Sequence, residues 1–268
     1  MVASEAATLA RIEPIRTWNT PIATTGWILL VDGVVWKIRG NSWLSHSRAE
    51  FLFLSCVSVP LWLVFEFYNK YVIHAWHYMG LADRSLRYLW YAWCFATICP
   101  ALFETGDLIS ALRDRRAPSG RTVPPARHAP GVAGWVIIAA GAAMLLMPIA
   151  FPSPYMAAPL FLGFTLLLDP LDARGGAESI LADLRDHRHG RLINLAAAGL
   201  IWGILSEFWN YRAAMKWFYL IPIAAEWRAF EMPLPGYLGY PAFALEGFAM
   251  YVTARRLVWR AASRPISI

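Results

Sequence analysis

Seven apolar stretches, each close to the length that crosses a bilayer, constrain this chain more than any other feature. They lie near residues 22–38, 51–73, 88–112, 132–151, 156–171, 192–215 and 238–260. A transmembrane helix needs roughly 20 mainly apolar residues, and the first and fifth stretches are the shortest. The composition agrees, because 58% of the residues are hydrophobic and 16% are charged. We therefore expect an all-α, polytopic membrane helical bundle of about seven transmembrane helices.

The basic residues predict the orientation of this bundle. With seven spans and an external N-terminus, 16 of the 24 Lys and Arg residues fall on one side, including those of the Arg-rich segments 113–130 and 172–191. The positive-inside rule assigns that side to the cytoplasm. We expect a protein of the bacterial cytoplasmic (inner) membrane, with its N-terminus outside and its C-terminus inside. The basic residues behind the net charge of +6 gather on one side of the predicted membrane, so we expect no nucleic acid partner.

The two halves of the chain repeat each other. The matched residues are Asp32 with Asp169, Glu66 with Glu207, Asn69 with Asn210, Trp76 with Trp217, Tyr78 with Tyr219, Pro100 with Pro241 and, across a one-residue gap, Glu104 with Glu246. Chance aligns apolar residues in two membrane segments, but it rarely also aligns acids, amides and prolines. Matching helices lie four spans apart, which is an even number, so both copies cross the bilayer in the same direction.

This pattern predicts a parallel 3+1+3 internal repeat. Residues 1–21 form an external N-terminal segment, and 22–112 form the first three-helix repeat. Residues 113–155 combine a basic linker with a connecting transmembrane helix. The second three-helix repeat covers 156–260, and a cytoplasmic tail covers 261–268.

Acids inside apolar stretches are the candidates for chemistry. An ionised carboxylate in a bilayer costs several kcal/mol unless it is paired, so these side chains should face the bundle interior. An Asn three residues after an acid lies on the same helical face and can orient it. The candidate catalytic residues are Glu66, Glu207, Asn69, Asn210, Glu104 and Glu246. The alternative is that they are polar links that clamp helices together in lipid.

Aromatic residues close to these acids are the candidates for a substrate wall. They are Tyr68, Trp209, Trp76, Trp217, Tyr78 and Tyr219. We expect the last four at the outer ends of helices, where an interfacial aromatic belt would equally explain them. His74 and His77 could supply two metal ligands, but no third ligand is evident, so no metal is expected. The three cysteines lack paired CxxC spacing, so neither a zinc site nor a disulfide framework is expected.

The paired units resemble the small integral-membrane lycopene cyclases and related carotenoid or terpene cyclases. The resemblance rests on Trp76-His77-Tyr78 with Pro100 to Glu104, and on Trp217-Phe218-Tyr219 with Pro241 to Glu246. That family usually carries two adjacent acids after its proline, whereas each half here carries one. The resemblance implies that a neutral carboxylic acid protonates an alkene and that aromatic faces stabilise the carbocation. A carboxylate or water would then remove a proton, with no cofactor and with a membrane lipid or other hydrophobic substrate as partner.

Two other classes of function stay open. The 3+1+3 arrangement also resembles the SWEET sugar transporters, and symmetric acids at a repeat interface suit a proton-coupled small-molecule carrier. The SWEET proline, however, lies in the first helix of each unit, whereas Pro100 and Pro241 lie in the third. A non-catalytic scaffold subunit of a membrane complex is the third class. Substrate, oligomeric state and protein partners do not follow from the sequence.

Overall fold

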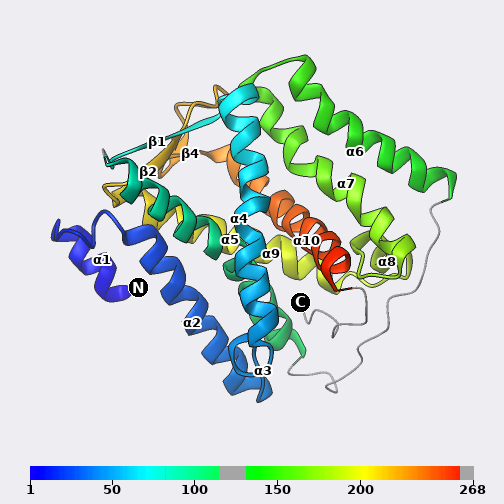
Figure 1. Cartoon of the computed structure of the whole chain (residues 1–268), viewed down its shortest axis with the longest axis horizontal. Helices are drawn as coiled ribbons and strands as arrows, with labels where there is room; N and C mark the ends of the chain where they lie inside the picture. The colour runs from blue at the N-terminus through cyan, green and yellow to red at the C-terminus, as the bar shows by residue number, and fades with distance from the viewer. Residues whose placement is uncertain (82, 115–130, 260–268) are drawn as a thin grey trace.

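A computed structural model describes residues 1–81, 83–114 and 131–259, and it is mostly helical (Figure 1). The elements are α1 (Val2–Leu9), α2 (Asn19–Arg39), α3 (Trp43–His46), α4 (Arg48–Tyr68), the π-helical turn η1 (Asn69–Ile73), β1 (Trp76–Met79), α5 (Arg84–Asp114), α6 (Val132–Ala150), the 3-10 turn η2 (Pro154–Met156), α7 (Ala157–Gly175), α8 (Ile180–Arg185), α9 (Gly190–Arg212), β2 (Lys216–Tyr219), β3 (Arg228–Ala229), β4 (Met232–Pro233), the 3-10 helix η3 (Leu234–Leu238) and α10 (Gly239–Val258). Most of the predicted basic linker and the predicted C-terminal tail lie outside the described residues.

Within the described ranges, six helical segments are long and apolar enough to cross a membrane. They are Asn19–Arg39, Arg48–Ile73, Arg84–Asp114, Val132–Ala150, Pro154–Gly175 and Gly190–Arg212. Each overlaps one of the stretches identified in the sequence. The seventh stretch forms α10, which carries Glu246, Arg255 and Arg256 and is not among these six. The chain is thus an all-α, multi-pass integral membrane protein by the length and hydropathy of its helices.

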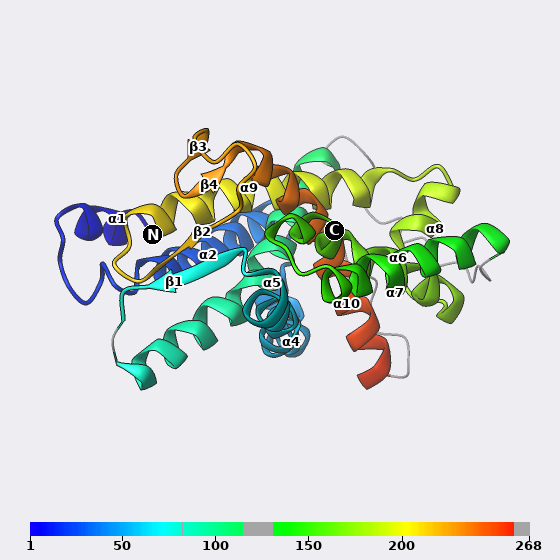
Figure 2. The same cartoon turned by 90° about the horizontal axis from the view of Figure 1, so that it is seen from above.

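Glycine allows α6 to approach α7 at the edge of the bundle (Figure 2). A Cβ atom added to Gly141 of α6 would lie 2.5 Å from the backbone nitrogen of Leu167 in α7. A Cβ atom added to Gly163 of α7 would lie 2.5 Å from the side chain of Leu145 in α6. Because lipid tails are as apolar as the helices, close backbone packing of this kind is what holds two membrane helices together. The predicted connecting helix, α6, therefore packs against the first helix of the second half, α7.

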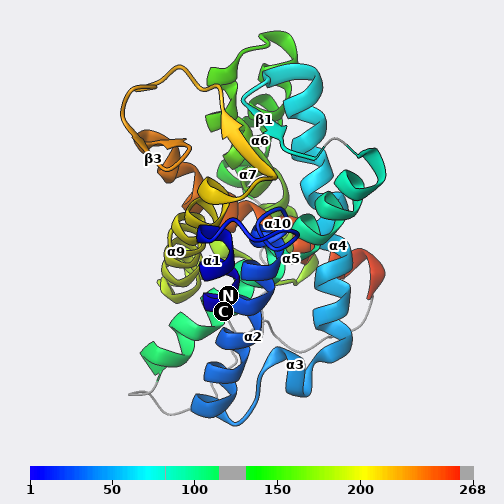
Figure 3. The ribbon, with the colours of Figure 1, turned by 90° about the vertical axis from the view of Figure 1, so that its left-hand side faces the viewer.

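The strands β1 and β2 pair at the end of the bundle opposite α3 (Figure 3), which we call the strand end. Trp76 lies opposite Tyr219, and Tyr78 lies opposite Trp217, in an antiparallel register. These aromatic residues were expected at helix ends, and the structure places them on strands instead. The pairing is symmetric, because the sequence match of Trp76 with Trp217 and Tyr78 with Tyr219 exchanges the two pairs. Period-2 alternation then directs all four side chains to one face of the ribbon.

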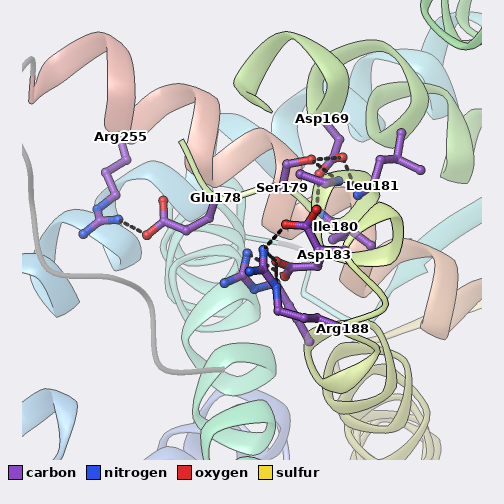
Figure 4. Close-up of polar contacts among 11 residues, drawn as sticks. Asp169, Glu178, Ser179, Ile180, Leu181, Asp183, Arg188 and Arg255 are labelled. Atoms are coloured by element: carbon purple, nitrogen blue, oxygen red, sulfur yellow. Dashed lines mark hydrogen bonds and ion pairs between the residues drawn. The ribbon is translucent and has the colours of Figure 1, made fainter. Parts of the chain in front are cut away.

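Two equivalent buried aspartates, Asp32 in α2 and Asp169 in α7, accept hydrogen bonds from the starts of the short helices α3 and α8. Asp32 accepts hydrogen bonds from Ser42 Oγ at 2.9 Å and from the backbone nitrogen of Leu44 at 2.9 Å. Asp169 accepts from Ser179 Oγ at 2.6 Å and from the backbone nitrogens of the two residues that follow, at 2.7 and 2.9 Å (Figure 4). Each carboxylate therefore satisfies the N–H groups that a helix start leaves unpaired. The contact of Asp32 with Ser42 thus recurs 137 residues later as the contact of Asp169 with Ser179.

Candidate functional site

Glu66 lies at the strand end of α4, where three donors converge on one of its oxygens. Its Oε1 accepts from Trp62 Nε1 at 2.9 Å, Trp76 Nε1 at 3.0 Å and Tyr78 OH at 2.5 Å. An indole N–H can only donate, so this oxygen accepts from both Trp62 and Trp76. Three donors on one oxygen hold the carboxyl group in a single orientation.

Glu207 occupies the equivalent place on α9 and is fully buried. Its Oε1 accepts from Trp217 Nε1 at 3.0 Å, Tyr219 OH at 2.8 Å and Tyr240 OH at 2.6 Å. Its second oxygen, Oε2, is buried without a hydrogen-bond partner among the described residues. The two acids therefore share a design in which one oxygen is saturated by donors.

The third donor comes from a different place in each half. Trp62 precedes Glu66 by one turn of α4, but the matched position in α9 is Gly203. A Cβ atom on Gly203 would lie 2.3 Å from the ring of Tyr240, so this glycine makes room for that ring. Tyr240 of α10 then supplies from a neighbouring helix the donor that Trp62 supplies from the same helix. The trio of donors is conserved between halves although the residues are not equivalent.

Asn69 and Asn210 fix the aromatic strands rather than the acids. Asn69 accepts from the backbone nitrogens of Ala75 and Trp76 and donates to the Trp76 carbonyl at 2.8 Å. Asn210 bonds the backbone nitrogen and carbonyl of Trp217 at 2.9 and 2.8 Å. Both amides are buried. The spacing from acid to amide was predicted to orient the carboxyl group, and the structure shows that the orientation is indirect, through the strand that carries the donors.

A cavity of about 460 Å³ lies between the two glutamate sites. Its walls include donors to both acids, together with other aromatic side chains. These aromatic residues are Trp62, Trp76, Tyr78, Trp90, Phe95, Tyr155, Phe161, Trp202, Trp217, Tyr219, Tyr240 and Phe243. Neither Glu66 nor Glu207 lines the cavity itself. The indole and phenol groups separate each carboxylate from the cavity, so a bound molecule would contact the donors first.

The phenols are built to keep their protons. Burial raises the pKa of Tyr78 and Tyr219 well above the ordinary value, and the neighbouring Glu66 or Glu207 raises it further. Each phenol is therefore a neutral donor to its glutamate at neutral pH. A phenol oxygen also keeps acceptor capacity. Each Tyr–Glu pair can thus pass a proton between the cavity and the carboxylate without exposing the carboxylate.

The other candidates lie elsewhere. Tyr68 donates to the Leu145 carbonyl at 3.1 Å, and the backbone carbonyl of Trp209 accepts from Asn19 at 3.1 Å; neither residue lines the cavity. Tyr68 and Trp209 follow their acids by two residues, which turns them about 200° around the helix.

Glu104 and Glu246 are also apart from the cavity. Glu104 is 1% exposed, and its carboxyl group interacts with the side chain of Asp32. Glu246 accepts from the backbone nitrogen of Phe164 at 2.8 Å, which links α10 to α7. Sequence reasoning missed Trp62 and Tyr240. Trp62 could have been found from its spacing of one turn before Glu66, whereas Tyr240 carries no such signal.

Among residues 1–81, 83–114 and 131–259, no three His, Cys, Asp or Glu side chains are grouped so that they could hold a metal ion. Comparison with known proteins adds no relative: no family model, curated protein or solved structure matches the chain. The cavity and its two Tyr–Glu pairs are the features of the molecule that bear on its function.

Proposed function

We propose that this chain is a membrane-embedded enzyme that acts by carboxylate acid–base chemistry on a hydrophobic isoprenoid or lipid substrate. The observation that carries the proposal is that one aromatic cavity meets two separate Tyr–Glu pairs. A proton entering the substrate through one pair and a proton leaving through the other change its bonding but not its composition. The reaction class is therefore a cyclisation or isomerisation.

Each pair works as a relay. When the substrate loses a proton to the Tyr78 oxygen, Tyr78 passes its own proton to Glu66, and no phenolate accumulates. The reverse transfer, from a protonated glutamate through its tyrosine, donates a proton to the substrate. Protonation by one pair comes first, so the substrate carries positive charge until the other pair removes a proton. Indole and phenol faces attract a cation by about 0.5–2 kcal/mol each, so the cavity wall suits this intermediate.

The test is an isomer assay with relay variants. We expect membranes that contain the wild-type protein to convert an isoprenoid in a supplied lipid extract to a product of equal mass and different chromatographic retention. Tyr219→Phe combined with Tyr240→Phe removes both phenols on Glu207 and should slow conversion roughly 10²–10⁴-fold, the usual contribution of a positioned acid or base. Liquid chromatography with mass spectrometry measures the conversion.

Tyr237→Phe is the matched control, because its hydroxyl donates to the Ala229 carbonyl and not to an acid. That variant should convert substrate at the wild-type rate. If wild-type membranes form no isomer but accumulate a solute in a proton gradient, the protein is a carrier. If they do neither, the scaffold alternative replaces the enzyme.

We further propose that the bundle has seven spans in the 3+1+3 arrangement, with α10 as the seventh. Matching contacts support this, since Asp32 and Glu66 each accept from a residue ten positions later, as Asp169 and Glu207 do. The strand end then faces outward, and the C-terminus lies in the cytoplasm of a bacterial inner-membrane protein. The Arg-rich ends of α5, α8 and α10 fall on the cytoplasmic side in this arrangement.

Topology reporters test this orientation. A reporter fused after Arg127 or after Arg188 should lie in the cytoplasm, because an odd number of spans separates each position from the external N-terminus. A fusion in the 81–85 loop should be external. Alkaline phosphatase and green fluorescent protein fusions read the two sides in opposite ways. Matching signals from the 81–85 loop and from Arg188 would contradict the parallel repeat.

A further inference from the structure

The cavity reaches the protein surface at the start of α7. Tyr155 and Leu238 both line the cavity, and they are 51% and 78% exposed. Ala158 and Leu162, which follow Tyr155 along the same helical face, also line it and are exposed. An opening therefore lies between the first turns of α7 and the 3-10 helix η3, which we call the α7–η3 mouth.

The depth of this mouth places it beside lipid. Leu162 is eight residues into the candidate span Pro154–Gly175, and eight helical residues rise about 12 Å. That distance carries the mouth below the end of the span, where a membrane helix faces hydrocarbon. An opening confined to the loops would have faced water instead.

The chemistry of the mouth also favours lipid. The exposed residues of the cavity lining are Tyr155, Ala158, Leu162, Ile223, Pro235 and Leu238. The cavity lining contains no Lys, Arg, Asp or Glu from any described residue. A phosphate or other ionic headgroup would therefore lose its hydration without gaining a partner inside.

We infer that the substrate enters sideways from the outer half of the bilayer, through the α7–η3 mouth, and that it is an uncharged, single-chain apolar molecule. The cavity volume of about 460 Å³ suits one small ligand. The inference rests on the proposed function for the meaning of the cavity, since a reaction site needs a route in. The route itself can be tested without any turnover.

The experiment uses the full chain in phosphatidylcholine vesicles with a diazirine-bearing farnesol. After irradiation, mass spectrometry should find adducts in the α5 peptide around Trp90, Cys94 and Ile98, deep in the cavity lining. Ala158→Trp fills the mouth and should lower this deep labelling at least 10-fold. Ala139→Trp adds the same side chain to an exposed site on α6 outside the cavity, so it should label like the wild type.

Leu162→Trp is a second blocking variant, in case Ala158→Trp does not fold. Unchanged deep labelling in a folded blocking variant would overturn the mouth as the route. Deep labelling by a water-soluble diazirine as strong as that by farnesol would also overturn it, because the cavity would then open to water. A phosphatidylcholine with a diazirine in one acyl chain should label the surface of α6 and not the α5 site; strong α5 labelling would overturn the single-chain inference.

The labelling and the isomer assay fail separately. Deep farnesol labelling that the Trp variants block, without any isomer formed, would retain the lateral route and reject the enzyme. Isomer formation that survives both blocked variants would retain the enzyme and reject the route.

Discussion

Glu207→Gln should lower isomer formation roughly 10²–10⁴-fold while the protein still folds. The carbonyl oxygen of Gln can accept the same three donors that Glu207 Oε1 accepts from Trp217, Tyr219 and Tyr240. The new NH₂ group takes the place of Oε2, which has no hydrogen-bond partner among the described residues. An unsatisfied buried amide costs about 1–3 kcal/mol, which a folded protein can tolerate. The loss of activity then reports the lost ionisable carboxyl group and not a lost fold.

The matched control for this variant is Glu226→Gln, since Glu226 is exposed in the loop before β3. Its activity should equal that of the wild type. Glu66→Gln should behave like Glu207→Gln, because each of the two proton transfers needs its own glutamate. Full activity in either variant, measured with the same mass-spectrometric assay, would remove that glutamate from the reaction and favour the structural clamp.

The repeat in the sequence predicted much of this site. Matching Glu66 with Glu207 and Asn69 with Asn210 fixed which acids and amides would occupy equivalent places, and their contacts recur in the structure. Matching worked because these partners are close in sequence, so the same local geometry forms twice. Six of the seven apolar stretches likewise form helices that satisfy the length and hydropathy of a span.

The rest depends on packing between distant segments. Tyr240 reaches Glu207 from another helix only because Gly203 leaves space for its ring, and a repeat alignment cannot show a contact that one half lacks. The cavity needs the start of α7 and η3, which have no recognisable polar signal. Tyr68 and Trp209 are close to the acids in sequence, but two residues of a helix turn them about 200° away from the acids.

Asp169→Ala should lower the melting temperature by on the order of 10 °C, which is the largest stability effect that we expect from a single residue here. The carboxylate is 1% exposed and accepts from Ser179 Oγ and from the backbone nitrogens of Ile180 and Leu181 (Figure 4). Alanine leaves these donors at the start of α8 without their acceptor. Each buried donor left unpaired costs about 1–3 kcal/mol, and we expect about 3 kcal/mol in total because water can reach part of the α8 turn.

A melting-temperature shift of about 2–4 °C per kcal/mol gives the expected value for a chain of this size. The control is Asp83→Ala, which removes an exposed aspartate that directly precedes α5 and accepts from its first turn. Its Oδ1 accepts from the backbone nitrogen of Leu86 at 2.8 Å, but this bond is exposed, so water can replace the lost acceptor and the cost should stay near 0.5–1 kcal/mol. Thermal unfolding in detergent micelles measures both variants. Equal shifts for Asp169→Ala and Asp83→Ala would mean that burial adds nothing to the Asp169 cap and that the α7–α8 junction does not depend on it.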